Sequence, residues 1–279
     1  MLVDLKHILS LAEAGNFAIP AFNVYNMETV IGVIHAAEVK RAPIIMQIYP
    51  RLMKEETGYY LSPVVLAAAQ RASVPVCFHL DHGPSELETT RALRYGATGV
   101  MLDGSALDIE ENIALTKRVV DTCRHVGVQV EGELGHVGTT GDESMDEFTV
   151  PADAKRFVEE TGVACLAVLV GTAHGRYKKP PKLDIERIQQ IREATDNTAL
   201  VLHGGSGVPD DQIREAVRNG IRKVNFATDL CFAFLDGITA ELANPKHTYA
   251  VDSFMKSPIY AVQRFCEEKI DLVGAANRV

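Results

Sequence analysis

The sequence predicts an α/β protein, a (β/α)8 (TIM) barrel with a C-terminal helical extension. Three observations predict it: eight short apolar runs of β type, helix-period stretches between them, and a length of 279 residues. Strands that alternate with helices form parallel βαβ units, and a barrel commonly takes about 250 residues. A doubly wound open sheet is the alternative, but it more often has about five to seven strands.

The eight runs are rich in apolar residues, and four of them end in Asp or Gly. They lie at 18–22, 42–49, 74–81, 98–104, 127–134, 165–171, 198–204 and 222–227. Several helical stretches have Asp or Glu in the first turn and Gly just past the last residue, as helix dipoles and C-caps favour. No linker interrupts the pattern. Residues 1–279 are therefore predicted to form one barrel domain, with about 245–279 as an extension on the barrel or on another subunit.

Composition excludes several classes of function. Apolar residues make up 47% of the chain and charged residues 23%, so a large core can form, and the net charge is −9. A nucleic-acid partner is not expected, because phosphate-backbone binding needs a basic surface. No apolar run approaches the roughly 20 residues of a membrane helix. The five widely spaced cysteines suit reduced thiols, which predicts a cytoplasmic location.

Polar residues collect where the predicted strands end. In a parallel barrel these carboxyl ends share one face, which is where barrel enzymes place their chemistry. The histidines and carboxylates at these positions come from five different strands and are Asp81, His82, Asp103, Glu131, Glu133, His174 and His203. Chance supplies one or two such placements but not seven, so we expect an active site on this face.

Three of these residues, His82, His174 and His203, form a ligand set for catalytic zinc: three imidazoles with an open fourth position. Each histidine taken alone is better explained as a hydrogen-bonded loop residue. Together, at three strand ends and each beside a glycine, they favour metal binding. His79 lies two residues before Asp81 on the same side of its strand, and is predicted to be a hydrogen-bonded histidine of the core or of the site's surroundings.

Two glycine-rich segments, 171–175 and 203–207, flank the proposed ligands. Glycine lets the backbone approach a ligand closely, and exposed N–H groups cradle phosphates in many barrels. Each segment alone is more often a tight turn, but beside metal ligands both favour phosphate binding. Lys178 follows the first segment, where it either adds positive charge or forms a solvated pair with Lys179.

The chain carries six motifs of a known family, in order. It closely resembles the class II fructose- and tagatose-bisphosphate aldolases in HLDHG (79–83), MLDGS (101–105), VEGELGHVG (130–138), GTAHGRYK (171–178), LHGGSG (202–207) and KVNFAT (223–228). Two further segments, 18–29 and 110–117, extend the resemblance over essentially the whole chain. The length is closer to that of the shorter, tagatose-type branch.

The resemblance implies a role for each matched residue. Asp81 is implied to exchange the proton of the hydroxyl beside the cleaved bond, and the three histidines to bind catalytic Zn2+. The carboxylates implied to hold a second metal position or to surround the first are Asp103, Glu131 and Glu133. The residues implied to contact the dihydroxyacetone-phosphate part of the substrate are Gly175, Gly204, Gly205, Ser206, Asn225, Ala227 and Thr228. The family's phosphate loops also hold a monovalent cation, Na+ or K+.

Two positions depart from the family pattern. Relatives carry a Gly-Gly-x-Glu-type acid in the loop after ELG, whereas residues 135–148 here read GHVGTTGDESMDEF, which displaces Asp142 and Glu143. We take Glu143 as the acid that moves the proton at the nucleophilic carbon. Lys246 stands where an Arg that helps to bind a second phosphate is expected, so the aldehyde need not be glyceraldehyde 3-phosphate.

The function implied is a zinc-dependent aldolase that cleaves a ketose (bis)phosphate to dihydroxyacetone phosphate and an aldehyde through a metal-stabilised enediolate. A Schiff-base aldolase needs a desolvated lysine at a strand end, and Lys223 and Lys178 fit this poorly. Two other classes stay open: a non-catalytic barrel subunit of an aldolase complex, and another metal-dependent lyase or hydrolase acting on a sugar phosphate. The resemblance also implies a homodimer or homotetramer.

Overall fold

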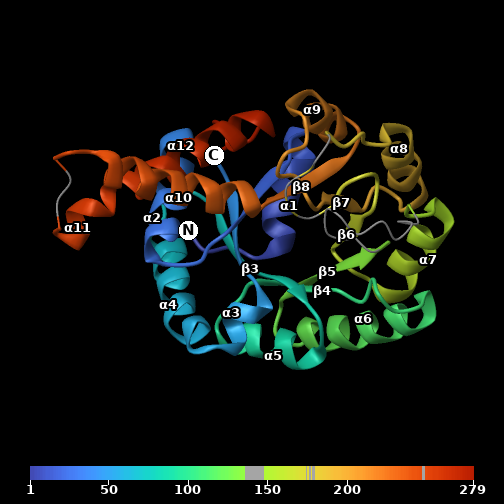
Figure 1. Cartoon of the computed structure of the whole chain (residues 1–279). Coiled ribbons are helices and arrows are strands. Elements are labelled where there is room, and N and C mark those ends of the chain that lie inside the picture. The colour runs from blue at the N-terminus through green and yellow to red at the C-terminus, as the bar shows by residue number, and fades with distance from the viewer. Residues whose placement is uncertain (136–147, 174, 176, 178–179, 247–248) are drawn as a thin grey trace.

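The computed structural model is a closed barrel of eight parallel strands surrounded by helices (Figure 1). It describes residues 1–135, 148–173, 175, 177, 180–246 and 249–279. The strands are β1 (Ile19–Asn23), β2 (Ile44–Ile48), β3 (Val76–Gly83), β4 (Gly99–Leu102), β5 (Gln129–Leu134), β6 (Cys165–Val168), β7 (Ala199–Leu202) and β8 (Ile221–Phe226). Each strand pairs with the next, and β8 closes the barrel against β1. The eight predicted strands are confirmed, and the open-sheet alternative is wrong.

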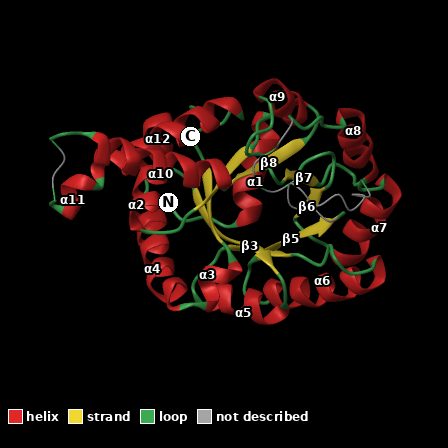
Figure 2. Cartoon of the chain, viewed as in Figure 1, coloured by secondary structure: helices red, strands yellow, loops and turns green. Residues whose placement is uncertain are grey.

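Helices form the outer ring of the barrel (Figure 2). They are α1 (Leu5–Gly15), α2 (Met27–Lys40), α3 (Pro50–Lys54), α4 (Glu56–Arg71), α5 (Glu86–Arg94), α6 (Ile109–Arg124), α7 (Pro151–Thr161), α8 (Ile185–Ala194), α9 (Asp210–Arg218), α10 (Thr228–Ala243), α11 (Val251–Phe254) and α12 (Lys256–Leu272). Side chains that accept a hydrogen bond from a first-turn N–H begin several of them, including Asp4, Asn26, Ser85 and Asp108. None of these described helices has the length and apolar content needed to cross a bilayer.

Each strand has two faces, because successive side chains point to opposite sides. On β3 the outward residues are Val76, Phe78 and Leu80, all buried beneath the helices. Outward aromatic residues pack in the same way, since Phe22 of β1 stacks on Phe226 of β8 with ring centroids 5.9 Å apart. The inward face of the strands carries buried polar and charged side chains among apolar ones, and the inside of the barrel therefore holds chemistry as well as packing.

The C-terminal helices extend the barrel on one side. Helix α12 packs against α2, where Gly32 allows close approach because an added Cβ would lie 2.8 Å from Val262 Cβ. Gly237 of α10 likewise faces the Cα of Pro258, at 2.6 Å from an added Cβ. The segment around α11 projects away from the barrel (Figure 1). The predicted C-terminal helical extension is confirmed.

Candidate active site

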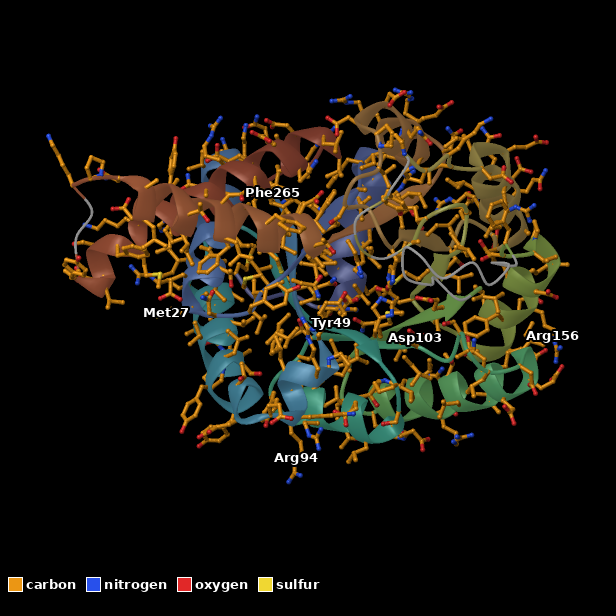
Figure 3. The ribbon with its side chains drawn as sticks, viewed as in Figure 1. Met27, Tyr49, Arg94, Asp103, Arg156 and Phe265 are labelled. Carbon is orange, nitrogen blue, oxygen red and sulfur yellow. The ribbon has the colours of Figure 1, made fainter. Side chains whose placement is uncertain are left out.

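The carboxyl ends of the strands bring the predicted polar residues together. Asp81 and His82 lie at the end of β3, Asp103 directly follows β4, and His203 directly follows β7. Glu131 and Glu133 of β5 and Asn225 of β8 complete the group. Tyr49 and Asp103 lie near the middle of the barrel, whereas Arg94 and Arg156 lie at its periphery (Figure 3).

A break in the strand pattern turns His82 toward the site. In a regular strand, consecutive side chains such as Asp81 and His82 point to opposite faces. Here the pairing of β3 with β4 shifts between Leu80 and Gly83, and His82 has a left-handed φ of 49°. Such strained backbone at a non-glycine residue is concentrated at functional sites. As a result, both Asp81 and His82 face the mouth of the barrel.

Two imidazoles meet at the centre of this mouth. His82 Nε2 lies 2.9 Å from His203 Nδ1, and the other nitrogen of each ring contacts a carboxylate: His82 Nδ1 lies 2.7 Å from Asp103 Oδ2, and His203 Nε2 lies 2.8 Å from Glu131 Oε1. Tyr49 stacks on His82 with ring centroids 6.2 Å apart. A carboxylate that accepts the N–H of a histidine leaves the opposite nitrogen as a lone-pair donor, which is the common arrangement around metal ligands.

The donor atoms fit a metal ion. One oxygen or nitrogen from each of Asp81, His82 and His203 lies within 4.8 Å of the others, and the same holds for His82, Asp103 and Glu133. With Zn–N bonds of about 2.0–2.1 Å, two nitrogens of a tetrahedral site lie roughly 3.3 Å apart. The contact of 2.9 Å between His82 and His203 is close to that spacing. Neutral imidazole and carboxylate donors suit zinc.

The electrostatic surroundings of His82 favour positive charge. Burial by itself lowers the pKa of His82, but Asp81, Asp103 and Glu133 raise it to about 10. Burial likewise raises the pKa of Asp103, while its hydrogen bonds and charge interactions with His82 and Ser105 bring it well below its ordinary value. A site that stabilises an imidazolium in this way also stabilises a bound cation.

Asp81 is held in one orientation by two side-chain amides. Asn23 Nδ2 donates to Asp81 Oδ2 at 2.8 Å, and Asn225 Nδ2 donates to Oδ1 at 3.1 Å. Gln47 Nε2 in turn donates to Asn23 Oδ1 at 2.9 Å. Neither Asn23 nor Gln47 was among the predicted site residues. Their signal was a polar residue on the inward face of an otherwise apolar strand.

The loops after β6 and β7 lie against each other and against the start of α10. Gly204 has φ of 64°, and a Cβ there would lie 2.5 Å from Ala173 O. Tyr177 Oη accepts a hydrogen bond from Ala173 N and donates to Gly204 O, which ties the two loops together. Ser206 Oγ accepts from the N–H of Asp229 in the first turn of α10. This bond brings the loop after β7 to the start of α10, where Ala227 and Thr228 lie.

A second polar layer lies deeper in the barrel. Lys223 is fully buried and its Nζ lies 2.8 Å from Glu131 Oε2. A Schiff base needs a lysine whose amine is free to attack the substrate, whereas Lys223 is paired with Glu131 below the mouth of the barrel. His79 is buried as predicted, but neither ring nitrogen has a hydrogen-bond partner within the described part of the chain, so the expected hydrogen bonding is wrong. Burial and the charge of Lys223 lower the pKa of His79 to about 3.

Three predicted site residues, His174, Lys178 and Glu143, lie outside the described residues. Gly175 is described, next to His174. Lys246, predicted to stand near a second phosphate, follows α10 in the projecting segment, where its N–H donates to Asn244 Oδ1.

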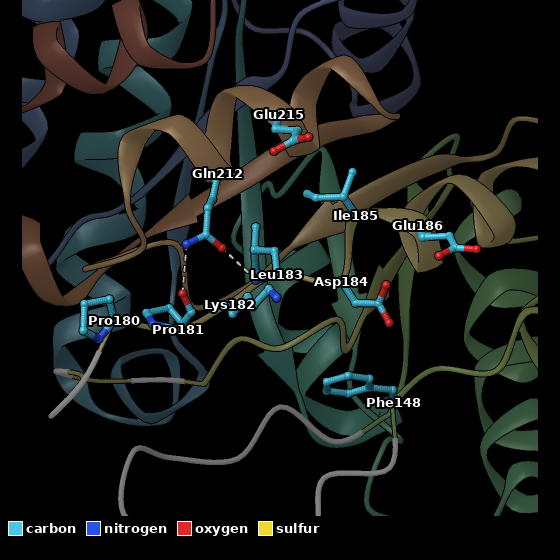
Figure 4. Close-up of a pocket in the computed structure, with 10 residues that line it drawn as sticks. All are labelled: Phe148, Pro180, Pro181, Lys182, Leu183, Asp184, Ile185, Glu186, Gln212 and Glu215. Atoms are coloured by element: carbon cyan, nitrogen blue, oxygen red, sulfur yellow. Dashed lines mark hydrogen bonds between the residues drawn. The ribbon is translucent and has the colours of Figure 1, made fainter.

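An open pocket of about 860 Å³ lies beside the segment that leads from β6 to α8 (Figure 4). Gln212 of α9 anchors that segment, because its Oε1 accepts from Leu183 N at 2.7 Å and its Nε2 donates to Pro181 O at 3.0 Å. Asp81, His82 and His203 do not line this pocket, so it is distinct from the histidine and carboxylate cluster.

Comparison with known proteins identifies the family. The model of the family "Fructose-bisphosphate aldolase class-II" matches residues 3–278. The crystal structure of the YdjI aldolase from Escherichia coli K12 has 36% sequence identity and a TM-score of 0.90, covering 100% of this chain and 99% of that one. A fructose-bisphosphate aldolase from Campylobacter jejuni shares the fold, with 23% identity, a TM-score of 0.85, and coverage of 100% and 97%. The chain belongs to the class II fructose-bisphosphate aldolase family and is an aldolase, a carbon–carbon lyase.

Proposed function

We propose that the chain is a zinc-dependent aldolase that reversibly cleaves a ketose (bis)phosphate to dihydroxyacetone phosphate and an aldehyde. One observation carries the proposal: His82 Nε2 and His203 Nδ1 approach to 2.9 Å beside the buried carboxylate of Asp81. Two imidazole donors next to a fixed carboxylate provide a metal position and a proton acceptor in one place.

His82, His174 and His203 would hold the zinc. The described neighbours of His174 support its inclusion, because Ala173, the residue before it, is bridged by Tyr177 to Gly204, the residue after His203. When bound, zinc supplies a Lewis acid that stabilises negative charge on the substrate's ketone oxygen. Asp103, Glu131 and Glu133 surround the ligands or offer a second metal position. A monovalent cation in the phosphate loops is part of the proposal.

Asp81 is proposed to take the proton from the hydroxyl beside the bond that breaks, and to return it in the condensation direction. Its two amide partners, Asn23 and Asn225, hold the carboxylate in one orientation, as a positioned general base requires. Glu143 is proposed as the acid at the nucleophilic carbon. Asn225 Oδ1 is buried and has no hydrogen-bond partner among the described residues, which makes it available to a substrate hydroxyl.

The phosphate of the substrate is proposed to lie where the loop after β7 meets α10. The N-cap residue of that helix, Ala227, has no side chain that can cap the N–H groups of the first turn, and a helix N-terminus favours an anion. The residues proposed to contact the dihydroxyacetone-phosphate part are Gly175, Lys178, Gly204, Gly205, Ser206, Asn225, Ala227 and Thr228. The carboxylate of Asp229 also lies at this site, where its Oδ2 accepts a hydrogen bond from the N–H of Gly207.

A retro-aldol and condensation screen of the zinc-loaded protein tests the function. Dihydroxyacetone phosphate would be offered with aldehydes that differ in length, phosphorylation and configuration. We expect turnover that a chelator abolishes and zinc restores, and no covalent trapping by borohydride in the presence of substrate. Trapping with activity that survives the chelator would establish a Schiff-base enzyme instead. Protein that holds no metal and ignores every ketose phosphate would be a non-catalytic subunit.

The assembly is proposed to be a homodimer or homotetramer. Large apolar side chains are exposed on the C-terminal helices and the segment between them, and a second copy would cover them: Leu235, Leu242, Tyr249, Val251 and Tyr260. Light scattering after gel filtration tests this. A single domain over 1–279 and a cytoplasmic location are proposed with it, the latter because all five cysteines are unpaired.

A further inference from the structure

A fully buried ion pair lies one step below the proposed zinc ligands. Lys223 of β8 and Glu131 of β5 have no exposed surface, and Nζ lies 2.8 Å from Oε2. Over the described residues this is the one ion pair recorded for Lys223. Removing two charges from water costs free energy that their attraction only partly offsets, so a buried pair is weak evidence of a stabilising role. Its place in the barrel points to another role.

The two oxygens of Glu131 serve different partners. Oε1 lies 2.8 Å from His203 Nε2, whereas Oε2 accepts from Lys223. When Nε2 of His203 carries the proton that Glu131 accepts, Nδ1 presents its lone pair to the site, where it lies 2.9 Å from His82 Nε2. The short contact with Glu131 therefore favours the form of His203 in which Nδ1 is available to a metal, although Glu133 Oε2 lies 3.3 Å from that nitrogen.

Glu131 also has a competing partner. His79 Nε2 lies 3.5 Å from Glu131 Oε2, too long for a hydrogen bond, and the His79 ring nitrogens have no hydrogen-bond partner within the described ranges. A carboxylate that lost its lysine could rotate to satisfy this buried imidazole. That rotation would draw Oε1 away from His203.

We propose that Lys223 is a positioning residue that keeps Glu131 on His203 rather than on His79, and so directs His203 Nδ1 toward the metal. The inference rests on the proposed zinc function. Two side chains would thereby support the ligand His203: Glu131 of β5 contacts it directly, and Lys223 of β8 holds Glu131. Among the described residues, Lys223 Nζ bonds to Glu131 and not to His82 or His203, so its effect on the ligands passes through Glu131.

Zinc affinity of the purified chain tests the proposal, measured by competition with a chromophoric chelator. Lys223→Met keeps the length of the side chain but removes the donor, and we expect zinc to bind roughly 10- to 100-fold more weakly, the usual cost of losing a partner of a metal ligand. Arg222→Met is the matched control. Arg222 is also buried and on β8, but it pairs with Glu13 at 3.1 Å on the outer side. This control should bind zinc as the unmodified chain does, and equal affinities for Lys223→Met and the unmodified chain would overturn the proposal.

His79 provides the second arm, and its single variant does not depend on the folding of Lys223→Met. His79→Leu is expected to bind zinc at least as tightly as the unmodified chain, and the double variant with Lys223→Met is expected to recover affinity lost by Lys223→Met alone. Weaker zinc binding by His79→Leu would contradict the competition. None of these readouts uses turnover. Failure of the unmodified chain to bind zinc would therefore refute the proposed function, whereas unchanged affinity in Lys223→Met would refute the positioning role alone.

Discussion

The two faces of the barrel strands are built from different chemistry. On β3, Val76, Phe78 and Leu80 face the helices, while the alternate residues, His79 and Asp81 among them, face the inside of the barrel. Burial of apolar surface contributes roughly 25 cal/mol per Å2, so the outer face supplies a large share of the folding free energy. The inner face offsets part of that stabilisation, because burying charged and amide groups costs free energy.

Several polar atoms on the inner face are buried without a hydrogen-bond partner among the described residues. Gln47 Oε1, both ring nitrogens of His79, and Asn225 Oδ1 are buried, and no described residue provides their hydrogen bond. Native proteins have only a few such groups, and they concentrate where function requires them. The comparison teaches that one strand carries stability on one side and catalysis on the other. Substitutions on the two faces should therefore affect different measurements.

The largest effect is expected for His203→Ala. This change removes a proposed zinc donor, and we expect zinc affinity to fall by more than roughly 100-fold, since even the partners of ligands cost 10- to 100-fold. Turnover should fall to background, while the free energy of unfolding measured in urea without zinc changes little. Leu202→Ala, on the outer face of the same strand, serves as the stability control. Zinc bound by His203→Ala with undiminished affinity would remove His203 from the ligand set.

Asp81→Ala is expected to separate chemistry from metal binding. Loss of a positioned general base costs about 10²- to 10⁴-fold in kcat, and zinc affinity should stay within a few-fold of the unmodified chain. Steady-state kinetics together with metal analysis of the purified variant check this. Loss of zinc along with activity would show Asp81 to be a ligand and not the base.

Phe22→Ala removes a buried aromatic side chain from the outer face of β1. Phe22 is fully buried, stacks on Phe226 and contacts the ring of Phe265 on α12. We expect the free energy of unfolding to fall by about 3–5 kcal/mol. Activity per folded molecule at low temperature should be nearly unchanged. A large loss of kcat without a loss of stability would show that the two faces are not separable.

Asn23→Ala is the smallest of the four changes. It removes one amide donor to Asp81, and a hydrogen bond to a charged group is worth about 1.5–3 kcal/mol. We expect kcat to fall roughly 10- to 100-fold with zinc affinity retained. Gln47→Leu, which removes only the partner of Asn23, should have a weaker effect on kcat. The reverse order of the two variants would contradict the chain Gln47–Asn23–Asp81.

The strands could be predicted from the sequence because their outer faces are apolar. Short apolar runs between helix-period stretches identify strands locally, so all eight strands were predicted and the carboxylates and histidines at their ends were expected to meet. The inner face is harder to predict, because its contacts join residues far apart in the chain. Lys223 and Glu131 are 92 positions apart, and the burial of Lys223 places it in a role that its position at the start of a strand did not suggest.

Local backbone geometry was the second feature that could not be predicted from the sequence. Nothing in the letters of HLDHG predicts that His82 adopts a left-handed φ, yet this conformation and the register shift bring Asp81 and His82 to the same side. Asn23 and Gln47 were missed because an amide on an apolar strand is also explained by a polar contact within the core. Their role became visible only when their hydrogen bonds led to Asp81.

The position of zinc is the most direct test of an inner face built for catalysis. Crystals of the zinc-loaded chain would be measured above and below the zinc absorption edge. Anomalous density is predicted about 2.0–2.1 Å from both His82 Nε2 and His203 Nδ1, with Asp81 unligated beside it. Zinc found only elsewhere, or no anomalous density at the carboxyl ends of β3 and β7, would contradict the central claim.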